Sequence, residues 1–375
     1  MVEWMKLVAV SDVLYGYPFE SSQFSEDSTY MPLIRIRDVK PAKASTYYSG
    51  EFNEVYRIKK GDILVGMDGE FNLGKWNDRD GLLNQRVLKL KGKDGYSIDG
   101  YLFHYMGPVF KKIEKETAGG SVKHLSAKVI NSILIPIPSL EEQARIVGIL
   151  DTFTSAIDNL KEQIAQRRKQ YEYYRDQLLD LEGKTGVEMK FITDVAKSFT
   201  GLTYKPENVS DSGTLVLRSS NINDDVLSFD DNVFVQMEIP ERARVQENDI
   251  LICVRNGSKR LVGKAAMITK EAEGMAFGAF MTILRSFAIN SKFLFYVWQS
   301  EKVRRQYKGD EAMPIAQITA KDFQRIVIPV PPLSEQQHIV SILDTFEASI
   351  QNLEAQLKQR EKQYEYYRNK LLTFE

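Results

Sequence analysis

The sequence predicts an α+β protein in which two mixed α/β globular regions alternate with two long helices, arranged as an internal pseudo-two-fold repeat. Three observations predict this class. Residues 135–181 align without gaps to residues 328–374, with 28 identities over 47 positions. Both stretches have the apolar spacing of a long helix. The regions that precede them contain short β-type runs between turn signals, which is typical of a mixed globular fold.

This pattern divides the chain of 375 residues into four segments. We expect globular regions at 1–138 and 184–331, and helices at 139–183 and 332–375. The expected strands inside the globular regions are Leu33–Ile36, Asp62–Val65, Arg86–Leu90, Leu215–Leu217, Asp249–Val254 and Met281–Leu284. Each region then ends with a helix and a strand: Tyr101–Ile113 and Ile133–Ile137 in the first, Lys292–Tyr307 and Ile326–Val330 in the second.

The two helical segments carry the same heptad seam. Apolar or tyrosine residues recur at steps of four and three in both copies, at 146, 150, 153, 157, 160, 164, 171, 174, 178 and 181, and at 339, 343, 346, 350, 353, 357, 364, 367, 371 and 374. This spacing is that of a coiled coil. Arg167 and Arg360 occupy corresponding seam positions, where a polar residue commonly fixes the register of the helices.

Composition excludes several classes of protein. The chain has 50 basic and 51 acidic residues, which excludes a uniformly basic polyelectrolyte but not a local basic patch. Cys253 is the one cysteine, so a disulfide framework and a multi-cysteine zinc site are excluded. The three histidines are scattered along the sequence and do not indicate a metal site. No apolar run approaches the roughly 18 residues of a membrane span, so we expect a cytoplasmic protein without a membrane partner.

The motifs of common enzymes are also missing from the sequence. It has no G-x-x-x-x-G-K-[ST] phosphate loop, no G-x-G-x-x-G dinucleotide motif and no Asn/Asp-Pro-Pro-aromatic stretch of an amino-methyltransferase. Glu188 and Lys190 form a Glu-x-Lys triplet of the kind that many nucleases contain, but they lie at the repeat boundary, which favours an exposed linker. We therefore predict a non-catalytic protein with no catalytic residues and no metal ligands.

Loops in both globular regions have the composition of a nucleic-acid surface. Gly66–Trp76 and Arg255–Arg260 each follow a predicted strand and combine glycine with amide and basic side chains. Such side chains form paired hydrogen bonds with base edges or contact phosphates. A solvated hairpin tip has a similar composition, and that alternative stays open. The candidate DNA-binding residues are Asp68, Glu70, Asn72, Lys75, Gln85, Arg86, Ser121, Lys123, His124, Arg218, Asn221, Arg255, Asn256, Ser258, Lys259, Arg260 and Gln317.

Tyrosines gather near the end of each predicted helix. Two of the three in each copy lie on the seam, where core packing explains them, but Tyr173 and Tyr366 lie off it. Tyrosine and arginine are enriched at protein interfaces. We therefore predict a partner interface at Tyr173, Arg175, Tyr366 and Arg368, with an ordinary exposed surface as the alternative.

The doubled motif resembles a known family. Ile-Pro-x-Pro-x-Leu-x-Glu-Gln-x-x-Ile occupies residues 135–146 and, with Val at its third position, residues 328–339, and each copy leads into a long helix. The strands at 61–65 and 248–252, each followed by a loop that contains glycine, share the likeness. In these features the chain is similar to the specificity (S) subunit of type I restriction-modification enzymes, and the resemblance covers the whole sequence.

The resemblance implies a division of labour. Each globular region would be a target recognition domain that reads one half of a bipartite site in double-stranded DNA. The helices would form an antiparallel coiled coil that separates the domains and binds two methyltransferase subunits. S-adenosylmethionine, ATP and Mg²⁺ would belong to partner subunits, including two restriction subunits, so this chain itself would bind no cofactor.

Two other classes remain as alternatives. One is a coiled-coil scaffold whose globular regions bind proteins, and the other is a stand-alone nuclease or methyltransferase. The missing motifs argue against the second of these. The residue pattern itself supports DNA recognition, because two unlike domains suit a target with unlike halves, whereas two like helices suit two copies of one partner.

Overall fold

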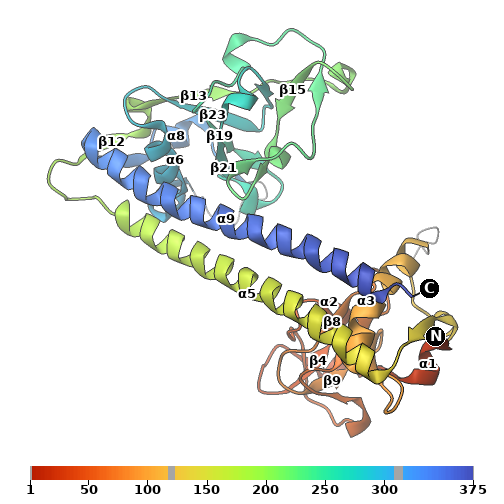
Figure 1. Cartoon of the computed structure of the whole chain (residues 1–375). Helices are drawn as coiled ribbons and strands as arrows, with labels where there is room; N and C mark the ends of the chain where they lie inside the picture. Colours follow the sequence, from red (N-terminus) through yellow and green to blue (C-terminus); the bar gives the residue numbers. More distant parts are fainter. Residues whose placement is uncertain (1, 117–122, 308–315, 375) are drawn as a thin grey trace. The chain divides into compact units, whose positions relative to one another are not determined.

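The chain folds into two compact units, here described separately. The computed structural model describes residues 2–116, 123–307 and 316–374. The first unit consists of Met1–Lys161 with Ala355–Glu375, and the second of Glu162–Glu354 (Figure 1). Among the described residues, none of the helices combines the length and the apolar character that a membrane crossing requires.

The first unit has two main sheets. An antiparallel sheet has the order β2-β10-β7-β8, formed by Ser11–Tyr15, Val87–Gly92, Ile63–Gly66 and Leu73–Lys75. A second sheet has the order β3-β5-β4-β9-β6, formed by Phe24–Ser25, Tyr47–Tyr48, Met31–Ile34, Gly81–Leu83 and Arg57–Ile58. Within it β4 and β9 run parallel, with Leu33 opposite Leu82 and Ile34 opposite Leu83.

Helices cover the antiparallel sheet and complete its core. Helix α3 (Asp99–Glu116) places Leu102, Met106 and Phe110 against Leu88 and Leu90 of β10, and all five side chains are buried. The remaining elements are α1 (Leu7–Val10), α2 (Ile36–Val39), α4 (Ala127–Ser132), and the paired strands β1 (Glu3–Lys6) and β11 (Leu134–Ile137). Strand β11 leads directly into the first long helix.

The second unit repeats this plan. Its antiparallel sheet has the order β13-β23-β19-β21, formed by Ala196–Thr200, Met281–Ser286, Ile250–Cys253 and Ala265–Met267. Its other main sheet has the order β14-β18-β15-β22, formed by Val209–Ser210, Phe234–Val235, Thr214–Leu217 and Ala276–Phe277. Strands β15 and β22 are parallel, as β4 and β9 are. The internal repeat therefore extends through the globular regions, whose sequences have diverged.

Shorter elements complete the second unit. Three strand pairs are β12–β25, β16–β17 and β20–β24, formed by Glu188–Phe191 with Val327–Val330, Ile222–Asn223 with Val226–Leu227, and Arg255–Asn256 with Ala316–Gln317. The helix expected at Lys292–Tyr307 is two helices, α6 (Ser291–Gln299) and α7 (Glu301–Tyr307), followed later by α8 (Ala320–Phe323). The break is at Ser300, whose amide and hydroxyl both donate to the carbonyl of Val297.

The two long helices are α5 (Leu140–Leu178) and α9 (Leu333–Leu372) (Figure 1). In the first unit, Phe153 of α5 stacks on Tyr367 of α9, with 5.1 Å between ring centroids. In the second unit, the Nη2 atom of Arg168 lies 2.6 Å from a carboxylate oxygen of Glu354. Within each unit, segments of the two helices therefore lie against each other.

The repeated glutamine fixes the start of each long helix. The side chain of Gln143 is fully buried, donates to the carbonyls of Tyr96 and Pro138 at 2.8 and 3.0 Å, and accepts from the amide of Ile98 at 3.1 Å. Gln336 makes the corresponding bonds to the Pro331 carbonyl and the Asn290 amide, both at 2.9 Å. The Glu-Gln motif is thus a structural joint between helix and globular region.

Candidate nucleic-acid interface

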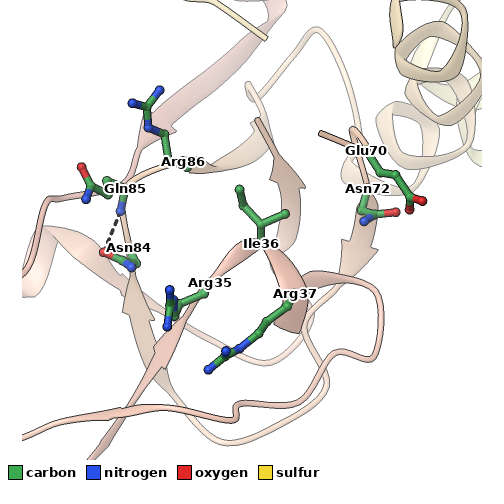
Figure 2. A pocket seen from close by; sticks show the side chains of 8 residues that line it. All are labelled: Arg35, Ile36, Arg37, Glu70, Asn72, Asn84, Gln85 and Arg86. Carbon is green, nitrogen blue, oxygen red and sulfur yellow. Dashed lines mark hydrogen bonds between the residues drawn. The ribbon is translucent and has the colours of Figure 1, made fainter. Parts of the chain in front are cut away.

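The parallel strands of the first unit create an open pocket. Because β4 and β9 run in the same direction, the residues that follow them meet at one edge of the sheet. Arg35, Ile36 and Arg37 follow β4, and Asn84, Gln85 and Arg86 follow β9; with Glu70 and Asn72 these residues line a pocket of about 490 Å³. Figure 2 shows Ile36 between Asn84–Arg86 on one side and Glu70 and Asn72 on the other. We call this pocket the first cleft.

A glycine lets the chain pass close beneath the first cleft. The amide of Tyr17 donates to the carbonyl of Leu83 at 2.9 Å, and a Cβ atom on Gly16 would lie 2.0 Å from the carbonyl oxygen of Asn84. Any side chain there would displace the Asn84–Arg86 turn. In the second unit a Cβ on Gly201 would lie 2.1 Å from the carbonyl oxygen of Gly278. The same close approach therefore exists in both units.

A buried carboxylate shapes the turn after β4. Asp38 accepts a hydrogen bond from the amide of Arg35 at 2.9 Å and from the hydroxyl of Ser45 at 2.6 Å. The guanidinium of Arg37 donates to Ser45 and Thr46 at 2.9 and 2.7 Å. These bonds fix the backbone from which Arg35 and Arg37 extend into the first cleft.

Three predicted residues form one cluster beside the cleft. An isolated bridge pairs Asp68 with His124, and the carboxylate of Asp68 lies 2.5 Å from Nδ1 of His124 and 3.5 Å from Nε of Arg86. Asp68 thereby orients both side chains. A carboxylate repels DNA phosphates, so its position favours an orienting role over a direct DNA contact.

The other predicted residues of the first unit divide between the cleft and its surroundings. Glu70, Asn72, Gln85 and Arg86 line the cleft. Lys123 is paired with Glu114 at 3.2 Å. Lys75 lies on the α3 and α5 side, with its ammonium 4.7 Å from the ring centroid of Phe103 and 3.8 Å from Asp151. Ser121 lies outside the described residues.

The second unit builds the corresponding surface with different side chains. In the first unit the amide of Met67 donates to the Arg86 carbonyl, and Leu125 donates to Met67. In the second, the amide of Val254 donates to the Phe280 carbonyl at 3.0 Å, and Ile318 donates to Val254 at 2.8 Å. Phe280 therefore stands where Arg86 stands, and Gly278–Phe280 corresponds to Asn84–Arg86.

Several predicted residues of the second unit meet at this surface, which we call the second cleft only because it corresponds in position to the first. Strand pairing places Arg255 opposite Gln317, and the guanidinium of Arg255 lies 5.3 Å from the ring centroid of Phe280. Asn256 donates to the hydroxyl of Ser219 at 3.2 Å, which links this strand to the turn that follows β15. Ser258, Lys259 and Arg260 continue the same loop, and the amide of Ser258 donates to Asn256 at 2.9 Å.

Arg218 and Asn221 occupy the turn after β15. Arg218 is paired with Asp231 at 2.9 Å. Asn221 is fully buried, accepts from the amide of Arg218 at 2.9 Å and donates to the carbonyls of Ser228 and Asp231. It shapes this turn as Asp38 shapes the turn after β4. The position of Asn221 therefore does not support the prediction that it contacts DNA.

Sequence reasoning missed Arg35, Arg37 and Phe280, and it left Asn84 out of the candidates although Asn84 directly precedes Gln85 and Arg86. They follow strands that carry no glycine-rich signal, and only the parallel pairing brings them together. The strand predicted at Leu33–Ile36 included Arg35, but in the structure that strand ends at Ile34. An alignment of the two globular regions around these parallel strands was the one sequence signal that could have identified these residues.

The predicted partner interface is partly exposed. Tyr173 and Tyr366 are both 61% exposed, and each ring packs edge-on against the next tyrosine of its helix. Arg175 is buried, paired with Asp176 at 3.2 Å and packed near the ring of Tyr171, so its position does not support a role as a surface anchor. Arg368 is half-buried beside its own helix neighbour Tyr364.

In the part of the chain that the structure describes, no three His, Cys, Asp or Glu side chains are grouped so that they could hold a metal ion. The thiol of Cys253 is buried, and burial raises its pKa. A buried thiol with a raised pKa is unreactive as a nucleophile.

Comparison with known proteins agrees with this geometry. The chain is 27% identical over 389 residues to the type I restriction enzyme EcoBI specificity subunit of Escherichia coli, covering 94% of this chain and 81% of the relative. It is 28% identical over 348 residues to the EcoR124I/EcoR124II specificity subunit of the same species, covering 87% and 84%.

Solved structures show a similar fold. The S subunit of a type I restriction-modification system from M. genitalium matches with a TM-score of 0.59 at 16% identity, covering 100% of this chain and 97% of that one. A chain from a structure of complex assembly in the type I system matches with a TM-score of 0.58 at 18% identity, covering 99% and 96%.

The family match covers both halves of the sequence. Residues 1–167 and 184–361 match the family described as the type I restriction modification DNA specificity domain. These two stretches include both clefts and the start of both long helices. The chain therefore belongs to the type I restriction-modification DNA specificity family and carries its domain twice.

Proposed function

We propose that this chain is the DNA-recognition subunit of a type I restriction-modification complex, with each cleft reading one half of a bipartite target in double-stranded DNA. One observation carries the proposal: the same parallel-strand edge is built in both units, but it displays Asn84, Gln85 and Arg86 in one and Gly278, Ala279 and Phe280 in the other. A shared frame with different side chains suits two readers of different sequences.

The chemistry of the first cleft supports this function. Arg35, Arg37 and Arg86 supply positive charge, and Asn72, Asn84 and Gln85 supply amide groups. Arginine pairs with two acceptors of guanine and amides pair with adenine, while both also contact phosphates. The second cleft combines Arg218, Arg255 and Gln317 with an exposed aromatic ring.

The partners follow from the repeated helices. We infer that α5 and α9 form an antiparallel coiled coil and that two methyltransferase subunits dock on equivalent faces around Tyr173 and Tyr366. Both tyrosines have the same exposure and the same edge-on neighbour, which suits two copies of one partner. Two restriction subunits complete the proposed complex, which works in the cytoplasm, where it reaches the DNA.

Catalysis belongs to the partners. The chain is a specificity subunit and not an enzyme, and the assembled complex would be a DNA adenine methyltransferase and an ATP-dependent endonuclease. We propose that S-adenosylmethionine, ATP and Mg²⁺ bind to those subunits and that this chain binds none of them.

A selection from random duplex DNA tests the function. The full chain, assembled with the methyltransferase subunit of its own system, should enrich a split motif with two fixed halves. Arg35→Ala with Arg86→Ala should weaken the first half, whereas Lys60→Ala, which removes an exposed charge outside the cleft, should leave the motif unchanged. Enrichment of no motif, with protein partners still bound, would instead support the scaffold alternative.

A further inference from the structure

We infer that Phe280 selects a thymine in the second half-site by apolar contact with the thymine methyl group in the major groove. The inference rests on the proposed function and deepens it, because it names the base feature that one side chain reads. Phe280 is 58% exposed in the turn directly before β23, whereas Phe277 and Met281 nearby are buried. It stands at the position that Arg86 occupies in the first unit.

Hydrogen bonds hold the backbone at Phe280. Its carbonyl accepts hydrogen bonds from the amides of Val254 and Arg255 at 3.0 and 3.3 Å, and the next residue begins β23 in the central sheet. These bonds fix the point at which the Phe280 side chain leaves the backbone, and precise placement on well-ordered elements is what specific recognition requires.

A basic side chain of the second cleft lies beside the ring. The guanidinium of Arg255 lies 5.3 Å from the ring centroid, a distance at which cation and ring attract. Arg255 is paired across strands with Gln317. These side chains provide hydrogen bonds to phosphates or to adjacent base edges, and they keep the phenyl ring beside them at the DNA surface.

The chemistry of the ring restricts what it can read. A phenyl group neither donates nor accepts conventional hydrogen bonds, so it cannot distinguish bases by their polar edges. Thymine alone among the four DNA bases presents a methyl group in the major groove, and phenylalanine is one of the side chains that contact it. Exposed phenylalanine can also insert as a wedge between base steps. That role belongs to proteins that bind the minor groove and bend the duplex.

Replacement of thymine by uracil isolates the methyl group. The full chain assembled with its methyltransferase subunit would be titrated with duplexes in which each thymine of the second half-site is replaced in turn by uracil. At one position, uracil should weaken binding by about fourfold, the value of one buried methyl-sized group. With Phe280→Ala the same replacement should have no effect, because the methyl contact is already lost.

A matched variant controls for the loss of an exposed ring. Phe287 is 66% exposed in the same unit and lies one residue beyond the end of β23, so Phe287→Ala should retain the uracil effect. Sequence selection with Phe280→Ala should relax one position of the second half-site and leave the first half-site intact.

Three results would overturn the inference. They are equal sensitivity to uracil in wild type and Phe280→Ala, a uniform loss of affinity for all sequences, and a loss of methyltransferase assembly. The first contradicts a methyl contact, the second indicates a wedge or a phosphate effect, and the third indicates a protein contact. Failure of the wild-type complex to select any split motif would instead contradict the proposed function.

Discussion

At the residue scale, Arg86 presents its guanidinium from an unusual backbone. Its φ is 71°, in the left-handed region that favours glycine. Arg86→Gly should therefore remove the side chain without destabilising the turn. If the guanidinium contacts a guanine, binding to targets with the correct first half-site should weaken by about 1–3 kcal/mol. Quantitative DNA titration and thermal unfolding check this, and unchanged affinity would remove Arg86 from the recognition surface.

Gln143 stabilises the joint between the first globular region and helix α5. Gln143→Ala removes three hydrogen bonds and leaves two carbonyls and one amide unpaired in a buried joint. We expect a loss of roughly 2–4 kcal/mol of unfolding free energy, since each buried group left unpaired costs roughly 1–3 kcal/mol and water enters part of the space. Denaturant unfolding measures it.

Its neighbour provides the control for that variant. Glu142 is partly exposed and pairs with Arg145 on the same helix. Glu142→Ala should cost far less unfolding free energy than Gln143→Ala, because an ion pair in contact with solvent contributes little to stability. Equal losses for the two variants would show that the repeated Glu-Gln motif has no special structural role in the joint.

The stability of the first unit should depend on pH through His104. Its ring is fully buried, with Nε2 2.7 Å from Asp151 of α5 and Nδ1 3.0 Å from the Tyr364 hydroxyl of α9. Burial lowers the pKa of His104, and this outweighs the opposing effect of the Asp151 hydrogen bond. The neutral ring fits the site: Nε2–H donates to Asp151, while Nδ1 accepts from Tyr364.

The sign of the pH effect follows from this lowered pKa. As pH falls below about 6.5, the ordinary pKa of histidine, the unfolded chain binds a proton before the folded chain does, so the stability contributed by His104 decreases. The difference in melting temperature between wild type and His104→Gln should therefore shrink from about pH 7.5 to about pH 5.5. The exposed His338→Gln should show no such change in thermal unfolding. A difference that grows at low pH would contradict the neutral assignment.

At the scale of elements, the sequence predicted the long helices well. They span Leu140–Leu178 and Leu333–Leu372, against the expected 139–183 and 332–375, because a heptad pattern is local and repeated many times. The short strands were placed to within a few residues, whereas the helix expected at Lys292–Tyr307 was wrong as a single element. The helix is interrupted at Ser300, whose hydroxyl donates a hydrogen bond to the carbonyl of Val297. Hydrophobic periodicity does not predict such a bond.

The clefts were predicted less completely than the helices. The loops at Gly66–Trp76 and Arg255–Arg260 have a local signal in their glycines and amides, and both lie beside a cleft. Arg35 and Phe280 reach their clefts only through parallel pairing between strands that lie far apart in the sequence. Lys75 and Arg175 lie near aromatic rings, and composition cannot distinguish such basic side chains from ones that face solvent.

The exposed tyrosines of the long helices make a test of the proposed partner faces. Tyr173→Ala with Tyr366→Ala should weaken binding of the methyltransferase subunit by about 2 kcal/mol or more per site if these rings are interface anchors. The chain itself should remain folded, because both rings are 61% exposed. Analytical ultracentrifugation with the methyltransferase subunit measures the assembly.

A matched pair of exposed residues controls for that change. Glu172→Ala with Glu365→Ala alters the adjacent exposed positions of the same helices. We expect near-normal assembly in this variant. Normal assembly of the tyrosine variant as well would mean that the partner faces lie elsewhere on the helices.

At the scale of the whole molecule, the chain keeps its joints constant while its clefts differ. Both long helices begin with a buried glutamine that binds backbone atoms of the preceding region. Backbone partners do not depend on the side chains of the globular region. A region with a different sequence but the same loop geometry can therefore be accommodated by the same helix.

This independence predicts the outcome of exchanging a whole region. Replacement of residues 1–138 by the corresponding region of another specificity subunit should change the first half-site and leave the second unchanged. Gln143 should still find its carbonyl and amide partners, because its hydrogen bonds to Tyr96, Ile98 and Pro138 involve only main-chain atoms of those residues. Replacement of 184–331 should have the reciprocal effect. Methylation mapping in a host that expresses each chimera reports both half-sites, and a simultaneous change of both halves in an active chimera would show that the clefts do not read DNA independently.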